Sequence, residues 1–471
     1  MSSTYGAEAA AATPMLVRKK VWGWLSKVID VEEAKDQMLF VLPMMLTNVS
    51  YYLIPLVSVM FAGHLGELEL AGSNLANSWA SVTGYALMVG LSGALETLCG
   101  QGYGARLYGM LGIYLQTSCI ITIVFTIAVS ILWWFSDSVL ILLHQDAQIA
   151  DQAGLYLKYL IPGLFAFGFL QNLLRFLQTQ CVVMPLVVCS LVSLALHLGI
   201  VYVLVHWTTL GYRGAPVAAS ISLWISVLML SFYVLKAKKF ETTWEGFTRE
   251  SFSHVFTNFK IALPSAAMVC LEYWAFHILV LMAGLMPNSD ITTSLIAMCV
   301  NTGAILFMVA NGLSAAASTR VSNELGAENP DRARHAMVVT LKLTVLVVVC
   351  VVLALFFGHN LWASSFTDSH VIIDAFASMI PLLIASVTCD FIQGIFSGVA
   401  RGCGWQHLAA FINLGAYYCI GMPVAGLLGF KFKLYAKGLW IGIVCGVSVQ
   451  MIGLILLSKF SNWTRVELSH A

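Results

Sequence analysis

Charged side chains are scarce in this chain. Lys, Arg, Asp and Glu together make up 10% of its 471 residues, whereas hydrophobic residues make up 59%. The mean hydropathy is +0.85. Because soluble domains carry about 25% charged residues, this composition excludes a soluble globular protein and predicts a chain embedded in a lipid bilayer.

The signatures of several other protein classes are absent as well. The 24 basic and 23 acidic residues give a net charge of +1 and no polybasic signature, so no nucleic-acid partner is expected. The eleven cysteines contain no CxxC pair, so neither a metal site nor a disulfide framework is indicated. The sequence has no HExxH, GxSxG or GxxxxGK[ST] motif, so we expect neither an enzyme nor a cofactor. No repeated filter loop or ring of acids indicates a channel.

Long apolar runs are abundant instead. A membrane-spanning helix needs about 20 mostly apolar residues. Between polar segments, twelve such runs lie near residues 39–62, 73–99, 112–136, 154–177, 183–206, 213–235, 261–286, 291–318, 336–358, 371–400, 405–430 and 437–459. The sequence therefore predicts an all-α integral membrane protein with twelve transmembrane helices.

The basic residues indicate the orientation of these helices. If the amino terminus is cytosolic, the segments on the cytosolic side hold eighteen of the twenty-four Lys and Arg residues. The positive-inside rule therefore places both termini in the cytosol.

The two halves of the chain repeat each other. GLSGALETLCGQGYGA at 90–105 aligns without gaps on GLSAAASTRVSNELGA at 312–327, an offset of 222 residues. Other matches keep nearly the same offset, such as Leu42-Pro43 with Leu263-Pro264 and Phe169-Leu170-Gln171 with Phe391-Ile392-Gln393. Because each copy holds six spans, both insert with the same polarity, which predicts two pseudo-symmetric six-helix lobes around one central site.

The repeat also predicts the domain boundaries. We expect a cytosolic amino-terminal segment, an amino-terminal lobe, a polar cytosolic linker, a carboxy-terminal lobe and a cytosolic tail, at residues 1–38, 39–235, 236–260, 261–459 and 460–471.

Two acidic residues lie deep inside apolar runs of the second lobe. Glu272 is twelve residues from Lys260, about 18 Å along a helix, and Asp390 is eleven residues from Arg401, about 16 Å. Half of a bilayer core is about 15 Å, so both acids lie near the midplane and can share one site. Two adjacent carboxylates in a low dielectric cannot both stay ionised, which makes such a pair a proton-binding site.

A structural interpretation of the two acids stays open, in which each one bonds a hydroxyl or a backbone carbonyl as a link between helices. The repeat offers a contrast, because the first-lobe counterparts of Glu272 and Asp390 are Tyr51 and Gly168. Only the second lobe carries the acid pair.

Four further positions are candidates for the same cavity or its gate. Asn301, Tyr417 and the repeat counterpart Tyr51 are candidates for lining the cavity or bonding the acids, and plain packing is the alternative. Glu96, which precedes the glycine-rich GQGYGAR, is a candidate for the cytosolic contact between the lobes, and hydrogen bonding at a helix end is the alternative.

Four motifs in this order resemble plant multidrug and toxic compound extrusion (MATE) transporters: ETLCGQGYGAR at 96–106, LEYW at 271–274, RVSNELGAENP at 320–330 and FSGVARGCGWQ at 396–406. The likeness covers roughly residues 36–460. The resemblance implies an antiporter that exports organic cations, xenobiotics or secondary metabolites such as alkaloids and flavonoids in exchange for protons. It also implies that Glu272 and Asp390, in the seventh and tenth helices, form the proton site.

We therefore expect a proton-coupled exporter of small organic compounds that acts as a monomer in the plasma membrane or the vacuolar membrane. Two alternatives remain, namely coupling to sodium and a lipid or lipid-linked sugar flippase of related architecture. A pH gradient in sodium-free buffer discriminates the first, and assays with labelled lipids discriminate the second.

Overall fold

Helices make up almost all of the computed structural model, which describes residues 30–286, 289–365 and 369–464. Among these residues, twelve helices are long and apolar enough to cross a membrane, which confirms the predicted fold class. The spans are α2 (Val31–Gly63), α3 with η1 and α4 (Glu67–Ala80, Ser81–Tyr85 and Ala86–Gly104), α5 (Tyr108–Trp134), α7 (Ala147–Thr179), α8 (Met184–His206), α9 (Gly214–Lys236), α10 (Val255–Gly284), α11 (Ser289–Gly326), α12 (Pro330–Ser364), α13 (His370–Cys403), α14 to η6 (Gln406–Lys431) and α16 (Tyr435–Phe460). A short helix, α6 (Ser136–Leu142), joins α5 to α7. The predicted segments 1–38 and 460–471 lie partly outside the described residues.

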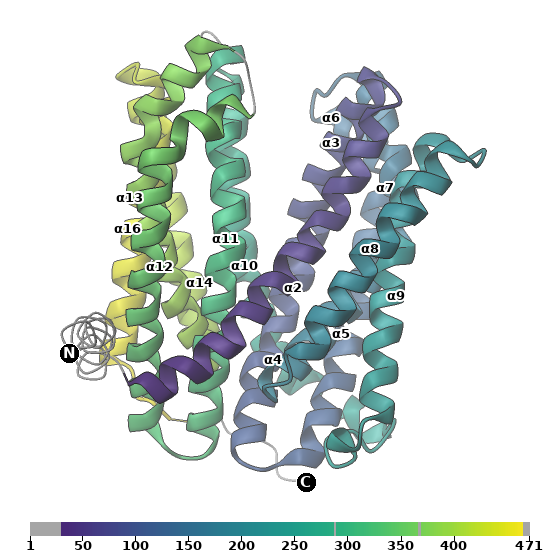
Figure 1. Cartoon of the computed structure of the whole chain (residues 1–471), viewed down its shortest axis with the longest axis vertical. Helices are drawn as coiled ribbons and strands as arrows, with labels where there is room; N and C mark the ends of the chain where they lie inside the picture. Colours follow the sequence, from purple (N-terminus) through teal and green to yellow (C-terminus); the bar gives the residue numbers. More distant parts are fainter. Residues whose placement is uncertain (1–29, 287–288, 366–368, 465–471) are drawn as a thin grey trace, which may run out of the picture.

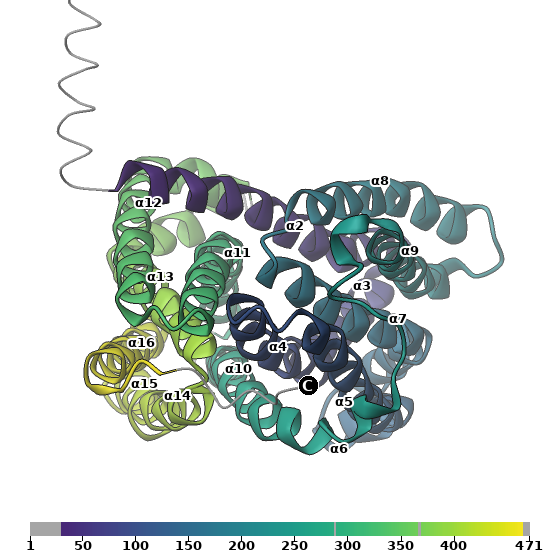
Figure 2. The same ribbon diagram turned by 90° about the horizontal axis from the view of Figure 1, so that it is seen from below.

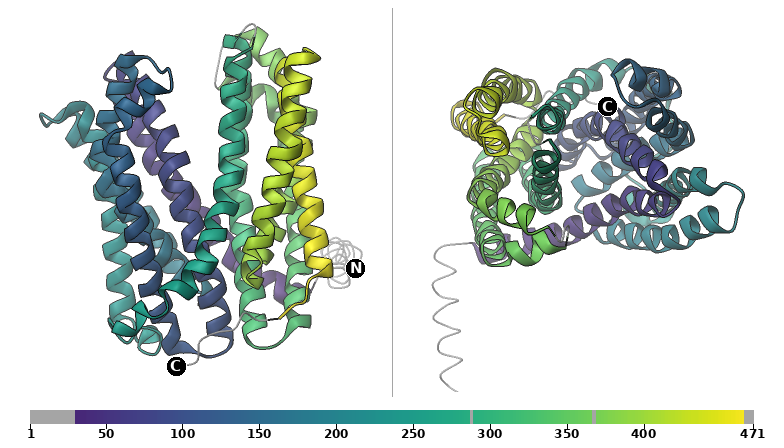
Figure 3. Two further views of the ribbon diagram at one scale, coloured as in Figure 1. Left: turned by 180° about the vertical axis from the view of Figure 1, so that it is seen from behind. Right: turned by 90° about the horizontal axis from the view of Figure 1, so that it is seen from above.

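The spans form two bundles, α2 to α9 and α10 to α16 (Figure 1). At one end, which we call the closed end, the bundles meet beside the α4–α5 and α11–α12 connections at residues 105–107 and 327–329. Toward the opposite end, the open end, the two bundles diverge, as the view from behind shows (Figure 3). The structure therefore has the two predicted lobes, which are in contact at the closed end and diverge toward the open end.

The first helix of each repeat crosses into the other lobe. Seen from below, α2 runs from the second lobe toward α8, and α10 runs beside α4 and α5 (Figure 2). Each of these helices holds a proline at matched repeat positions, Pro43 in α2 and Pro264 in α10. Because α2 begins at Val31, the helix starts before the predicted boundary at residue 39, and its first turns pack on the second lobe.

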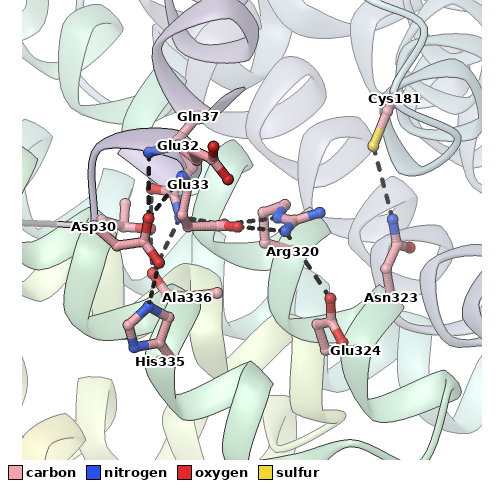
Figure 4. Close-up of polar contacts among 11 residues, drawn as sticks. Asp30, Glu32, Glu33, Gln37, Cys181, Arg320, Asn323, Glu324, His335 and Ala336 are labelled. Carbon is pink, nitrogen blue, oxygen red and sulfur yellow. Dashed lines mark hydrogen bonds and ion pairs between the residues drawn. The ribbon is translucent and has the colours of Figure 1, made fainter. Parts of the chain in front are cut away.

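An ion-pair cluster fastens the start of α2 to α11 and α12 (Figure 4). The Arg320 guanidinium donates two hydrogen bonds to Glu33, from Nε at 2.8 Å and from Nη2 at 2.6 Å. Asp30 caps α2 by accepting from the backbone N–H groups of Glu32 and Glu33, and it also lies 3.3 Å from the His335 ring. The backbone N–H of Glu33 and the His335 ring hold the pKa of Asp30 below its usual value.

Glycines allow close backbone contact at the closed end. A Cβ atom on Gly104 of α4 would lie 1.9 Å from the backbone oxygen of Asn323 in α11. A Cβ atom on Gly326 of α11 would lie 2.0 Å from the backbone oxygen of Gln101 in α4. Gly104 and Gly326 are repeat counterparts, so the contact is pseudo-symmetric, and no side chain larger than hydrogen fits at either position.

The polar linker between the lobes has no separate domain. It contains two short helices, η3 (Lys238–Phe240) and η4 (Arg249–Phe252), and it ends where α10 begins. Gln116 of α5 holds it at two points, donating to the backbone oxygen of Gly246 at 2.7 Å and accepting from the N–H of Thr248 at 2.9 Å. The linker is therefore anchored to the first lobe at the closed end.

Candidate functional site

A cavity of about 350 Å³ lies between the lobes. Helices of both lobes line it, and aromatic side chains form much of its wall, namely Tyr51, Tyr52, Tyr85, Phe167, Tyr273, Phe276, Phe307 and Trp440. Four charged residues, Arg175, Glu272, Asp390 and Arg401, line the same space. The π-helical turn η1 interrupts the α-helix of the second span where Ser81 and Tyr85 line the cavity, a local irregularity that often accompanies functional sites.

Glu272 of α10 and Asp390 of α13 share one hydrogen-bond donor. The amide nitrogen of Gln393 lies 3.1 Å from Oε1 of Glu272 and 2.9 Å from Oδ1 of Asp390. Gln393 follows Asp390 by three residues, so both side chains lie on one face of α13. Ser397, one turn further, donates to Oε1 of Gln393 at 2.9 Å and holds the amide in place. Both acids are partly buried and line the cavity.

A second chain of amides reaches Glu272 from α16. Asn413 donates through Nδ2 to the backbone oxygen of Met268 at 2.8 Å, and a backbone carbonyl can only accept. Oδ1 of Asn413 therefore accepts from Nε2 of Gln450 at 2.9 Å, while Oε1 of Gln450 accepts from the Tyr417 hydroxyl at 2.8 Å. With this orientation, the same Nε2 of Gln450 faces Oε2 of Glu272 at 3.4 Å. Each carboxylate oxygen of Glu272 thus faces one amide N–H donor.

Glu96 joins the lobes below this network. Its carboxylate lies 2.9 Å from Arg175 Nη1 of α7 and 2.9 Å from Arg401 Nε of α13. Arg401 also donates to Ser314 Oγ of α11 at 2.8 Å, and Arg175 to Gln178 at 2.8 Å. Glu96 is 1% exposed. The acid therefore belongs to a buried contact between the lobes and does not bond the end of its own helix.

The structure brings some of the other predicted residues to the site and leaves one outside it. Tyr51 lines the cavity from the first lobe, and Tyr417 is buried behind Glu272 through its bond to Gln450. Asn301 is exposed and does not line the cavity, so the structure does not bring it to the acids. A neighbouring stripe of α11 faces the cavity instead, and it includes Phe307 and Asn311.

Sequence reasoning missed three amides that complete the site, Gln393, Gln450 and Asn413. Each is a polar residue inside a long apolar run, the same signal that identified Glu272. In the sequence, Gln393 is distinguished only as part of the repeat match Phe391-Ile392-Gln393. Its first-lobe counterpart Gln171 lines the cavity, whereas Gln393 is buried behind the two acids and bonds both of them.

Comparison with known proteins identifies the family. The MatE family model matches residues 43–203 and again residues 264–427, in agreement with the internal repeat. Protein DETOXIFICATION 18 of Arabidopsis thaliana is 59% identical over 449 residues, which cover 95% of this chain and 96% of the relative. Protein DETOXIFICATION 17 of the same plant is 45% identical, with 92% and 91% of the two chains covered.

Solved structures agree with this assignment. The crystal structure of the eukaryotic MATE transporter AtDTX14 superposes with a TM-score of 0.88 at 39% identity, covering 92% of this chain and 97% of that one. A MOP superfamily transporter from Pyrococcus furiosus, 18% identical, shares the fold with a TM-score of 0.79 over 91% of this chain and 95% of its own. With both halves matched by the family model and the relatives covered almost end to end, this chain belongs to the MatE family of multidrug and toxic compound extrusion transporters.

Proposed function

We propose that this transporter exports small organic compounds in exchange for protons, and that Glu272 and Asp390 are its proton site. The observation that carries the proposal is the shared amide of Gln393, which holds two carboxylates of different helices in one partly buried position on the cavity wall. Carboxylates this close in a low dielectric repel each other, and taking up a proton relieves that repulsion.

Proton binding is coupled to substrate release through the cavity. A proton that enters from the open end neutralises the acids, which weakens the hold on a cationic substrate in the same space. A ligand shifts a conformational equilibrium only through its different affinities for the two states, so proton and substrate favour opposite ones. Loss of the proton on the other side of the membrane returns the protein to the substrate-binding state.

The donors around the acids favour a proton over a sodium ion. Gln393 and Gln450 both turn their N–H groups toward Glu272, and their oxygens accept hydrogen bonds from Ser397 and Tyr417 instead. A sodium ion needs oxygen ligands, and N–H groups repel it. Occupation by sodium would require both amides to rotate, which breaks the bond between Gln450 and Tyr417.

The cavity wall supports organic cations and planar secondary metabolites as substrates. Aromatic faces from both lobes, such as Tyr85, Phe167, Tyr273 and Phe307, offer stacking and cation–π contacts to a flat or positively charged compound. One chain supplies both lobes around the cavity, so we propose that a monomer is the working unit.

Uptake into proteoliposomes tests the coupling. A pH gradient alone, in sodium-free buffer, is expected to drive uptake of a monovalent fluorescent cation such as ethidium. Uptake that needs a sodium gradient and ignores the pH gradient contradicts proton coupling. A competition series of organic cations, flavonoids and organic acids on the purified protein then ranks the substrate classes.

We propose that the closed end faces the cytosol, in the plasma or the vacuolar membrane, with both termini on that side. A cysteine at exposed Glu245 of the linker is expected to react with an impermeant thiol reagent only from the cytosolic side. The matched control is a cysteine at exposed Thr209, in the α8–α9 connection at the open end, which is expected to react only from the other side. Both variants use a chain in which exposed Cys181 is replaced by Ser. The reverse pattern contradicts the proposed orientation.

A further inference from the structure

The floor of the cavity carries a fixed excess of positive charge. Arg175 and Arg401 both line the cavity, and one carboxylate, Glu96, lies between them. The side chains of Arg175 and Arg401 are 17% and 14% exposed, whereas that of Glu96 is 1% exposed. The two cations thus reach the cavity and the anion lies behind them. We call these three residues the arginine floor.

The arginine floor keeps unused donors. Arg175 bonds Glu96 and Gln178 through Nη1, and its buried Nε has no hydrogen-bond partner. Arg401 uses Nε for Glu96 and Nη2 for Ser314. One carboxylate contacted by two guanidinium groups stays ionised, and an arginine side chain does not lose its proton in proteins. The floor therefore holds a net charge of about +1 that does not titrate.

The sign of the whole cavity depends on this charge. Among the described residues that line it, the other charged groups are Glu272 and Asp390. With both acids ionised, two cations and three anions leave the site negative by one charge. With both acids protonated, the floor remains and the site is positive by one charge. Without the floor, protonation would only make the site neutral.

We propose that the arginine floor is the specificity-determining element that makes protonation reverse the sign of the cavity. This inference rests on the proposed proton site at Glu272 and Asp390. In the ionised state the cavity attracts a monovalent cation, and in the protonated state it repels that cation toward the open end. Protonation has the opposite effect on an anion, because a positive cavity binds it more tightly. Proton uptake therefore does not release anions from this cavity.

The other titratable groups on the cavity wall do not oppose this change in the sign of the cavity's charge. His277 of α10 adds positive charge when it is protonated, so it changes the cavity's charge in the same direction as protonation of the two acids. The remaining titratable groups are phenols, which are neutral over the relevant pH range, namely Tyr51, Tyr52, Tyr85 and Tyr273. Replacing His277 with Gln therefore gives a background in which the acids alone change the charge.

Two ions of nearly equal size and opposite charge test the proposal, tetraphenylphosphonium and tetraphenylborate. Their binding to the purified full-length protein in the His277→Gln background is measured by scintillation proximity at about pH 8 and about pH 5.5. Arg175→Gln lowers the floor charge by one, and it is expected to bind the cation about fivefold more tightly and the anion about fivefold more weakly at both pH values. Glu96→Gln raises the floor charge by one and is expected to do the reverse.

Two further variants separate the effect of charge from that of structure. Arg175→Lys keeps the charge and loses the planar fork, so it is expected to bind like the background. Arg320→Gln removes an ion pair between the lobes outside the cavity, and it is expected to leave the affinities for the two ions unchanged. Should Glu96→Gln fail to fold, the comparison of Arg175→Gln with Arg175→Lys carries the test.

Two outcomes overturn the proposal. One is that Arg175→Gln and Glu96→Gln shift cation affinity in the same direction, which indicates a purely structural contact. The other is that the background does not bind tetraphenylphosphonium more tightly than tetraphenylborate at about pH 8. Failure of the proton site itself gives a different result. Glu272→Gln would then leave the pH dependence of cation binding unchanged, while Arg175→Gln and Glu96→Gln would still shift cation affinity in opposite directions.

Discussion

Glu272→Gln is expected to lose nearly all proton-driven uptake while the protein still folds and reaches the membrane. Gln keeps the size of Glu, and its one amide oxygen can still accept from either Gln393 or Gln450, whereas it cannot titrate. Uptake into proteoliposomes under a pH gradient measures the loss. Size-exclusion chromatography and thermal unfolding of the purified variant show whether the fold is intact.

Asp390→Asn is expected to have a similar effect. Because Gln393 couples the two acids, the double variant should be little worse than either single one. Losses that add independently would indicate two separate sites. The matched controls are Glu245→Gln and Asp331→Asn, which make the same chemical changes at exposed positions far from the cavity. Uptake by Glu272→Gln at the rate of the unmodified chain would refute the proton site.

The midpoint of the pH dependence gives a finer test of the same site. Glu272→Asp keeps an acid but withdraws it by one methylene from Gln393 and Gln450, so we expect the midpoint of transport to shift. Tyr51→Phe, at the first-lobe counterpart, removes the buried hydroxyl of a residue that lines the cavity and is expected to leave the midpoint in place. A midpoint that moves only in Tyr51→Phe would assign the proton site to the first lobe.

Gly104→Val is expected to prevent the lobes from meeting at the closed end, and Gly326→Val is expected to do the same. A Cβ atom at either position would collide with a backbone oxygen of the opposite lobe, at 1.9 Å from Asn323 and 2.0 Å from Gln101. Backbone atoms cannot rotate aside as a side chain does, so the lobes separate there or α4 and α11 shift apart. Overpacking of this kind costs about 1–3 kcal/mol, enough to move a two-state equilibrium by roughly one to two orders of magnitude.

Spin-label distances measure this separation. Labels at Lys236 of α9 and Arg334 of α12, both exposed near the closed end, report the gap between the lobes in a chain without other exposed cysteines. We expect a longer distance in both glycine variants and slow transport, because the state in which this end is closed becomes rare. Gly199→Ala is the control, since nothing lies within 4 Å of a Cβ atom there. Unchanged distances and rates would show that α4 and α11 do not have to touch.

The sequence by itself determined the environment, the helices and the acids. Bilayer solvation requires long apolar helices, so hydropathy alone predicts twelve spans without knowledge of their packing. The 222-residue offset predicts the two lobes, because each copy must bury the same faces. Glu272 and Asp390 are visible because an acid in an apolar run is costly unless something in the fold compensates for it.

Only the tertiary structure decided which side chains meet. Gln393 and Gln450 lie 121 and 178 residues from Glu272, and an amide in an apolar run does not indicate its partner. Depth in the membrane follows from residue count, whereas the direction of a side chain around its helix follows from packing. Successive residues of a helix differ by about 100° in direction, so Asn301 lies in the same helix as Phe307 and Asn311 and still does not face the cavity. Glu96 is a second example. The sequence shows that it lies in the apolar run that forms α4, but not which residues bind it. The two arginines that contact it come from α7 and α13, one from each lobe, and meet only when the lobes are in contact.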